Sequence, residues 1–306
     1  MFWRGWTGPK PGQDHGENQD AFETRLVPGA ADGGMLLAVC DGAGSTLYAG
    51  PWARALAAAV EHYWPDLDDA GLTARLDEIR ARFQRTQPDD LPWYKEHKLA
   101  REGSQAAFLA VAFTPMPGTD EVSLRAVAVG DCTLILFRCD GSVASFPLSE
   151  SGQFGLSPRL VSTKPQPALL YDRWDASLQP GDLIVACTDA VGKWVLEGVE
   201  SADQASIFGL LRDLLDEDDH PEPGSRSADN GLFRRIAETV PQRRLHADDV
   251  TVVLCVPASP FSVDTPHDFA VAALESHLHG DFTGLVKTRS GWRKWTDAVV
   301  SWLRNG

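Results

Sequence analysis

The sequence has no apolar run that approaches the length of a membrane span, and MFWRGWTGPKPGQ at its start lacks the apolar region of a signal peptide. We therefore expect no membrane span and a cytoplasmic location. Positive charge is also scarce, because 28 Lys and Arg face 43 Asp and Glu, a formal net charge of −15. This balance argues against binding of nucleic acid, which needs clustered Lys and Arg to neutralise phosphates.

Cysteine is scarce too, and no two cysteines form a Cys-x-x-Cys pair. All five lie in or beside apolar, strand-like runs: Cys40, Cys132, Cys139, Cys187 and Cys255. We interpret them as small core residues of a protein in a reducing compartment. Neither a disulfide framework nor a zinc site is expected.

Apolar runs that meet an aspartate recur along the chain. They are MLLAVCDGAGS with Asp41, LIVACTD with Asp189, VSLRAVAVGD with Asp131, VTVVLCV after Asp248 and Asp249, and the neighbourhood of Asp20 in HGENQDAF. Any one aspartate has an ordinary explanation as a turn or capping residue. Several carboxylates at the rim of one sheet system, however, would repel one another and destabilise the fold unless a cation lay among them. An all-oxygen set of this kind suits Mg²⁺ or Mn²⁺ and disfavours zinc.

Six motifs occur in a fixed order, ENQDAF, DGAGS, GSQAAF, AVGDCTLILF, CTDAVGKW and DDVTVVL. In this order they resemble the successive motifs of the metal-dependent protein phosphatase family of type 2C. The forms NQDA and DGAGS are similar to those of its bacterial branch. The similarity covers residues 5–257.

The resemblance implies an α+β fold with four layers, an antiparallel β-sandwich of two sheets flanked by helices. It implies a phosphatase domain over residues 1–257 and leaves residues 258–306 as a linker and an amphipathic helical appendage. The implied activity is hydrolysis of phosphoserine or phosphothreonine in a phosphorylated protein. A Ser/Thr kinase would be a further partner.

For the metal centre, the resemblance implies that Asp41 bridges two Mn²⁺ or Mg²⁺ ions and that the Gly42 carbonyl binds one of them. Asp189 and Asp248 would bind the other ion. Asp249 would orient the loop and is the reserve for Asp248.

The resemblance also implies outer contacts around these ions. Asp20 would contact the metal through water, Asp131 would belong to a weaker third site, and Gln19 would hold a metal-bound water where many relatives have glutamate. Two ions about 3.5 to 4 Å apart lower the pKa of a shared water and direct it at phosphorus, so phosphoester hydrolysis is the expected reaction.

Substrate binding departs from the family pattern. Where the family often has a phosphate-binding arginine, five residues before Asp20, this chain has His15. His15 is either a phosphate ligand and general acid or a plain loop residue, and Arg4 or Arg25 is the alternative phosphate ligand.

Two further departures from the family pattern leave the metal-binding carboxylates intact and affect substrate binding instead. Cys132 and Thr133 replace the usual residues after the glycine and aspartate of the fourth motif, and Ala190 replaces a common glycine. Two alternatives to a protein phosphatase therefore stay open. One is a pseudophosphatase or phosphoprotein-binding regulatory module, and the other is a small-molecule phosphoesterase with the same metal centre.

The pattern of apolar residues predicts the elements of the first half. Residues 1–16 are expected to be an irregular leader, followed by helices over 51–64 and 72–83. Three antiparallel strands between residues 106 and 146 are expected to form one meander. Residues 147–182 are expected to be mostly irregular and correspond in position to a flap beside the active site of the resembled family.

In the second half, helices are expected in VGKWVLEG, DQASIFGLLRDLL and GLFRRIAETV. The acidic loop DEDDHPEPGSRSADN is expected to be a solvated connection and not a metal site. Near the end, Trp292, Trp295, Val299 and Trp302 have helical spacing. We expect this Trp-rich helix to dock on its own domain, with a partner or a membrane surface as alternatives.

Overall fold

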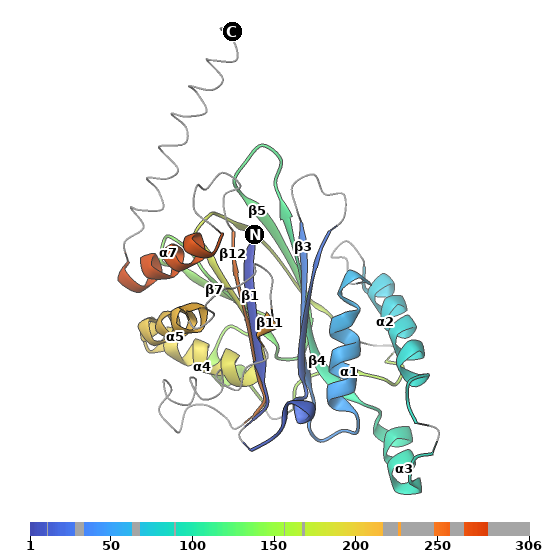
Figure 1. Cartoon of the computed structure of the whole chain (residues 1–306). Coiled ribbons are helices and arrows are strands. Elements are labelled where there is room, and N and C mark those ends of the chain that lie inside the picture. The colour runs from blue at the N-terminus through green and yellow to red at the C-terminus, as the bar shows by residue number, and fades with distance from the viewer. Residues whose placement is uncertain are drawn as a thin grey trace.

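Two β-sheets pack face to face, and helices cover both outer faces, so the chain forms four layers in the order α-β-β-α (Figure 1). The computed structural model describes residues 1–10, 12–27, 34–62, 68–88, 90–155, 157–166, 169–216, 226–227, 248–257 and 266–280. The expected fold class is confirmed. Within these ranges no helix has the length and apolar character needed to span a membrane.

The first sheet has the strand order β11-β1-β12-β10-β6-β7. Its strands are β11 (Arg226–Ser227), β1 (Phe2–Gly8), β12 (Val250–Val256), β10 (Leu183–Cys187), β6 (Thr133–Phe137) and β7 (Val143–Phe146). Neighbours are antiparallel except β1 and β11, which are parallel. The central strands β12 and β10 are buried at every position, which explains their unbroken apolar sequences.

The second sheet has the strand order β2-β3-β4-β5-β9 and is antiparallel throughout. Its strands are β2 (Asp20–Leu26), β3 (Met35–Gly42), β4 (Gln105–Pro115), β5 (Val122–Val129) and β9 (Asp172–Leu178). The short β8 (Val161–Ser162) pairs with the first residues of β4. The register places Asp20 of β2 directly opposite Asp41 of β3.

Helices cover the sandwich on two sides (Figure 1). On the first sheet lie α4 (Asp189–Glu200), α5 (Gln204–Asp216) and α7 (Pro266–His279), and on the second lie α1 (Ala49–Ala58) and α2 (Asp69–Gln84). The helix α3 (Trp93–Glu102) projects beyond the sheet and buries none of its residues. Short 3-10 turns are η1 (His15–Glu17), η2 (Val60–His62) and η3 (Ser151–Gln153).

The expectation of an irregular leader is wrong, because β1 pairs with β12 along its whole length. Phe2 and Trp6 point into the core under the helices of the first sheet, and Trp3 packs against the core between the sheets. A Cβ on Gly5 would approach the ring of Phe22 to 2.5 Å, so this position needs glycine for close packing. Gly5 interrupts the alternation of apolar and polar residues that is typical of a strand, so the sequence pattern does not predict β1.

The expected single meander is also wrong. β4 and β5 form a hairpin in the second sheet, but the chain then crosses into the first sheet, where β6 and β7 pair. Gly130 makes this crossing with a φ of +106°, and a Cβ there would lie 2.7 Å from the Cβ of Ala107. Both constraints favour glycine at the position where the chain changes sheets.

Residues 147–182 are less irregular than expected, since they contain β9, β8 and η3. In β9 the exposed and half-buried positions alternate, because the strand lies at the edge of the second sheet. The expected helix at 72–83 is confirmed as α2, and VGKWVLEG and DQASIFGLLRDLL form α4 and α5. The helix expected over 51–64 ends earlier, since α1 stops at Ala58 and the 3-10 turn η2 follows, while residues 63 and 64 lie outside the described ranges. The acidic loop, GLFRRIAETV and the Trp-rich segment lie outside the described residues.

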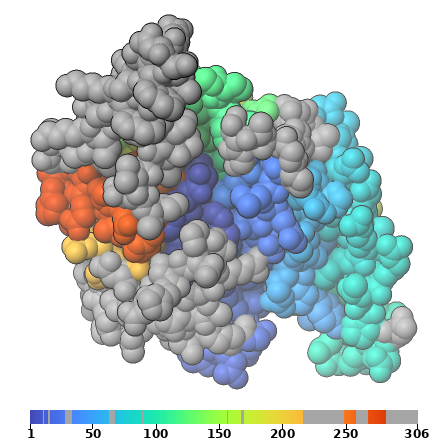
Figure 2. All heavy atoms as spheres, turned by 45° about the horizontal axis from the view of Figure 1, so that its top comes forward, coloured from blue at the N-terminus to red at the C-terminus, as the bar shows by residue number. Residues whose placement is uncertain are grey.

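The domain does not stop at residue 257. Phe269, Ala270, Ala273 and Leu274 of α7 belong to the same core cluster as Phe2 and the side chains of β12. In Figure 2, α7 in orange borders the dark blue N-terminal residues. The structure therefore includes residues 266–280 in the folded domain, because their apolar face completes the core over the first sheet.

We expect Leu274→Ala to lower the free energy of unfolding of the whole domain by about 2–5 kcal/mol, because Leu274 is 0% exposed and the substitution leaves a cavity. Leu26→Ala is the matched control, since Leu26 is 73% exposed. The control should change stability by less than about 0.5 kcal/mol. Urea unfolding of the full chain measures both, and equal effects would show that α7 is not part of the cooperative core.

Candidate functional site

Aspartates collect at one end of the sandwich. Asp20 is the first residue of β2, and Asp41 faces it from the end of β3. Asp131 lies in the crossing from β5 to β6, and Asp189 begins α4, one residue (Thr188) after the end of β10. Asp248 lies just before β12. Strand ends from both sheets thus deliver carboxylates from segments far apart in the sequence.

Asp41 is the electrostatic centre of this group. Burial raises the pKa of the Asp41 carboxyl well above its usual range, and repulsion by Asp20, Asp189, Asp131 and Asp248 raises it further. Each of these four carboxylates must be close to Asp41 to affect it. The structure therefore brings Asp20, Asp131, Asp189 and Asp248 into the neighbourhood of Asp41.

The carboxyls of Asp20 and Asp131 also have raised pKa values. Burial is the main cause that raises the pKa of Asp20, and hydrogen bonds from Thr188 and Thr251 oppose it. The pKa of Asp131 rises to about 7, first through burial and then through repulsion by Asp189. For these buried carboxyls, a charge-neutralising partner would be strongly favourable.

The donor chemistry fits a hard divalent cation. Among the described residues, no lysine or arginine is one of the leading influences on the pKa of Asp20, Asp41 or Asp131. Within the same part of the chain, no three His, Cys, Asp or Glu side chains meet at one point as a ready metal-binding group. A cation held here would take part of its coordination from water and backbone oxygen, which is how Mg²⁺ and Mn²⁺ usually bind.

Gly42 and Gln19 pack closely together beside Asp41. A Cβ on Gly42 would lie 2.7 Å from the backbone carbon of Ala49 and 2.8 Å from the carbonyl oxygen of Gln19. Gln19 also accepts a hydrogen bond from the Gly42 N–H at 3.2 Å. Its side-chain oxygen lies 3.2 Å from the place of a Cβ on Gly44. Gln19 thus faces the turn that follows Asp41.

Asp248 and Asp249 differ in environment. Asp249 is buried, and its carboxylate accepts hydrogen bonds from the backbone N–H of Lys10 at 2.8 Å and of Gln19 at 2.8 Å. Asp248 is exposed and accepts the N–H of Asp249 at 2.9 Å. Asp249 has both oxygens engaged with the loop from β1 to β2, whereas Asp248 is open to solvent.

The candidate phosphate ligands have different places. His15 lies in η1, in the connection from β1 to β2 that leads to Asp20. Arg4 is buried and shares the face of β1 with Phe2 and Trp6, toward the helices of the first sheet. Arg25 is exposed near the far end of β2. Neither arginine lies at the strand ends that carry the aspartates.

The substituted motif positions also have local roles. Thr133 donates its hydroxyl to the carbonyl of Asp131 at 2.9 Å and so fixes the crossing between the sheets. Cys132 is completely buried, and burial raises the pKa of its thiol. Ala190 donates its N–H to the carboxylate of Asp189 at 2.5 Å. These residues support the carboxylates through packing and backbone contacts.

Sequence reasoning missed a set of buried polar residues behind the aspartates. Thr188 donates its hydroxyl to Asp20 at 2.8 Å, and the hydroxyls of Thr7 and Thr251 lie 2.8 Å apart. Asn18 donates to Thr7 at 2.9 Å and accepts the N–H of Asp20 at 2.9 Å. For the three threonines, the signal in the sequence is a hydroxyl residue inside or beside a strand, and Asn18 has no comparable signal.

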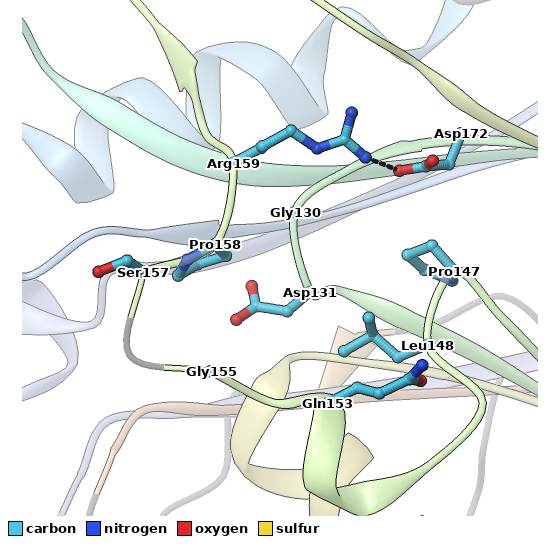
Figure 3. A pocket seen from close by; sticks show the side chains of 10 residues that line it. All are labelled: Gly130, Asp131, Pro147, Leu148, Gln153, Gly155, Ser157, Pro158, Arg159 and Asp172. Carbon is cyan, nitrogen blue, oxygen red and sulfur yellow. Dashed lines mark hydrogen bonds and ion pairs between the residues drawn. The ribbon is translucent and has the colours of Figure 1, made fainter.

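A cavity of about 260 Å³ lies beside Asp131 (Figure 3). Its walls come from the crossing and from the segment expected to form a flap: Gly130, Asp131, Pro147, Leu148, Gln153, Gly155, Ser157, Pro158, Arg159 and Asp172. Arg159 pairs with the carboxylate of Asp172 at one side, and the carboxylate of Asp131 lies between this pair and Gln153. The cavity therefore lies next to the cluster of aspartates, and its lining includes one basic side chain, Arg159, and two acidic ones, Asp131 and Asp172.

Residues 147–172, which include most of the cavity lining, are hydrogen-bonded to helices on both sides. Arg80, buried on α2, donates to the carbonyl of Ser162 at 2.8 Å and to the side chain of Gln166 at 3.1 Å. On the other side, Glu200 of α4 accepts the N–H and the hydroxyl of Ser151, both at 2.6 Å. The segment that carries most of the cavity lining is thus tied to α2 and to α4.

Comparison with known proteins identifies the fold. No protein-family model matches the chain, and no curated protein sequence matches it. Among solved structures, the serine/threonine phosphatase Stp1 from Staphylococcus aureus has a TM-score of 0.51 at 11% identity, over 84% of this chain and 95% of that chain. A bacterial serine phosphatase has a TM-score of 0.50 at 12% identity, over 86% and 100%.

A third structure, the catalytic domain of the serine/threonine protein phosphatase PstP in complex with two manganese ions, has a TM-score of 0.48 at 19% identity, over 83% of this chain and 97% of that chain. The chain has the fold of bacterial type 2C phosphatases, as the order of its motifs indicates.

We expect Asp131→Asn to raise the melting temperature of the metal-free protein at pH 8. The pKa of Asp131 rises from 3.8 to about 7 on folding, so stability falls as pH rises between these values. Above this window the ionised carboxyl destabilises the fold, and asparagine removes its charge.

Thermal unfolding in a chelator at pH 8 and pH 4 tests this expectation. The gain should shrink at pH 4, where the carboxyl is protonated in the folded protein. Asp90→Asn is the control at an exposed position and should have little effect at either pH. A loss of stability of the same size for Asp131→Asn at both pH values would contradict the repulsion.

Proposed function

We propose that this protein is a metal-dependent serine/threonine protein phosphatase that hydrolyses phosphomonoesters at a dinuclear Mn²⁺ or Mg²⁺ centre. The observation that carries the proposal is the convergence of carboxylates on Asp41, whose pKa four other aspartates raise. A structural protein has no need to gather unneutralised charge at the end of its core, because such a group lowers stability. A site for divalent ions explains the arrangement.

Each carboxylate has a role in this proposal. Asp20, Asp189, Asp131 and Asp248 all raise the pKa of the Asp41 carboxyl after burial, so Asp41 would be the carboxylate suited to bridge two ions. The ions supply Lewis acidity and a bound water of lowered pKa when present. Asp189 and Asp248 would hold the second ion, Asp131 would serve a weaker third site, and Asp20 would act through water.

Other residues would orient the nucleophile and the substrate. Gln19 is fixed by its backbone N–H on Asp249 and by its carbonyl on Gly42, so its side chain is well placed to hold a water beside the turn after Asp41. The Gly42 carbonyl is proposed as a backbone ligand. His15, in the connection that leads to Asp20, is proposed to bind the phosphate or to protonate the leaving group.

The proposal names a phosphorylated protein as substrate and a Ser/Thr kinase as the enzyme that supplies it. The cavity beside Asp131 supports a substrate larger than a free phosphate ester, because its walls add surface next to the carboxylates. A small-molecule phosphoesterase is the second candidate, since the same centre would act on any accessible phosphomonoester. A pseudophosphatase is the third, because the usual phosphate-binding arginine is replaced by His15.

We expect the purified chain to hydrolyse para-nitrophenyl phosphate only with added Mn²⁺ or Mg²⁺. Asp41→Asn should reduce kcat by at least about 10³-fold, because it removes the carboxylate at the centre of the group. Asp140→Asn is the matched control, since Asp140 is exposed in the turn after β6, at the far end of that strand from Asp131. Hydrolysis that survives Asp41→Asn, or that needs no metal, would reject the proposed centre.

We expect phosphoserine and phosphothreonine peptides to have a kcat/KM at least about tenfold above that of free phosphoserine, because contacts remote from the phosphate contribute binding in the transition state. Initial rates of phosphate release on both substrate sets measure this ratio. A higher kcat/KM on free phosphometabolites would favour the small-molecule phosphoesterase. Tight binding of phosphopeptides without turnover would favour the pseudophosphatase.

A further inference from the structure

Thr188 is the N-cap residue of α4, yet its side chain does not cap the helix. Its backbone has φ −80° and ψ 171°, the extended conformation usual at this position. A threonine there normally accepts a hydrogen bond from an N–H in the first turn and so stabilises the helix. The hydroxyl of Thr188 is used elsewhere, so α4 forgoes a stabilising contact that its own sequence offers.

The hydroxyl instead reaches from one sheet to the other. It donates to a carboxylate oxygen of Asp20 at 2.8 Å and accepts the N–H of Thr251 at 3.1 Å. The backbone N–H of Thr188 also donates to the carbonyl of Thr251 at 3.2 Å. A hydroxyl can donate a single hydrogen bond, and Thr188 donates its one hydrogen bond to Asp20. Thr188 is 0% exposed, so no water competes for the contact.

Asp20 needs such a contact because its neighbours repel it. Burial raises the pKa of Asp20 most, and Asp249 and Asp189 raise it further, whereas the hydrogen bonds from Thr188 and Thr251 stabilise its charged form. The backbone of Asp20 is held by Asn18 through its N–H. The backbone contact fixes where the residue lies, and within the described part of the chain the hydroxyls of Thr188 and Thr251 orient its carboxylate.

We propose that Thr188 is a positioning residue for the divalent-ion site, and that its hydroxyl fixes the orientation of the Asp20 carboxylate relative to Asp189. The proposal rests on the proposed function and adds a residue to it. Since Asp189 follows Thr188 directly in the chain, the hydrogen bond from Thr188 to Asp20 links the two segments, from different sheets, that carry Asp20 and Asp189. Threonine at this position thus sets the geometry of the site across the sandwich.

Titration of MnCl₂ into the chelator-treated full chain, followed by calorimetry, tests the proposal without measuring catalysis. Thr188→Val keeps the shape of the side chain and removes the hydroxyl, so we expect the Kd for Mn²⁺ to rise about tenfold or more. Thr188→Ser keeps the hydroxyl and should restore an affinity near that of the unsubstituted chain. This rescue separates the hydrogen bond from packing of the methyl group.

Thr163→Val is the matched control. Thr163 is also buried, and its hydroxyl accepts the backbone N–H of Ser104 at 2.9 Å, so it too ties two segments together. The control removes a buried hydroxyl that contacts no carboxylate in the described structure. We expect a loss of stability comparable to that of Thr188→Val but an unchanged Kd for Mn²⁺.

The outcomes separate this proposal from the proposed function. If Thr188→Val lowers stability and still binds Mn²⁺ with the original Kd, Thr188 only joins the sheets and the inference is overturned. If the unsubstituted chain binds no Mn²⁺, the inference and the proposed function both fall. If Thr188→Val does not fold, Thr188→Ala against Thr188→Ser decides, because both lack the methyl group and only serine keeps the hydroxyl.

Discussion

Repulsion between carboxylates at one end of the sandwich is the constraint that explains most of the local structure. Asp41 is half-buried among four other aspartates, and burial alone already disfavours its charge. The surrounding chain holds this group in place by hydrogen bonds that link both sheets. Gly42 permits close approach of the backbone, Asp249 secures the loop from β1 to β2, and Thr188 spans the gap between the sheets.

The sequence predicts the fold well where the apolar pattern is regular. The continuous runs of β10 and β12 and the helical spacing of Leu72, Leu76, Ile79 and Phe83 correspond to buried elements. It fails at β1, because a glycine that packs under Phe22 interrupts the alternation. It also fails at the crossing after β5, since a local pattern cannot tell whether the next strand joins the same sheet.

The site carboxylates can be predicted because each follows or precedes an apolar run. The local sequence therefore places them at the ends of strands. Their hydrogen-bond partners were not recognisable, because Thr7, Thr188 and Thr251 are ordinary residues of strands and caps when viewed alone. Their importance depends on contacts between segments distant in the chain. The same limit applies to Arg80, whose role comes from its contacts with Ser162 and Gln166.

The pairing of β1 with β12 has a consequence for biosynthesis. The second sheet is built mainly from strands early in the chain, so it can form while the ribosome is still translating the remainder. The first sheet must wait, because its N-terminal strand pairs with residues 250–256 and is covered by α7. Contacts of such long sequence separation form slowly. Nascent chains would therefore expose Phe2 and Trp6 until residues 250–256 and α7 have been synthesised.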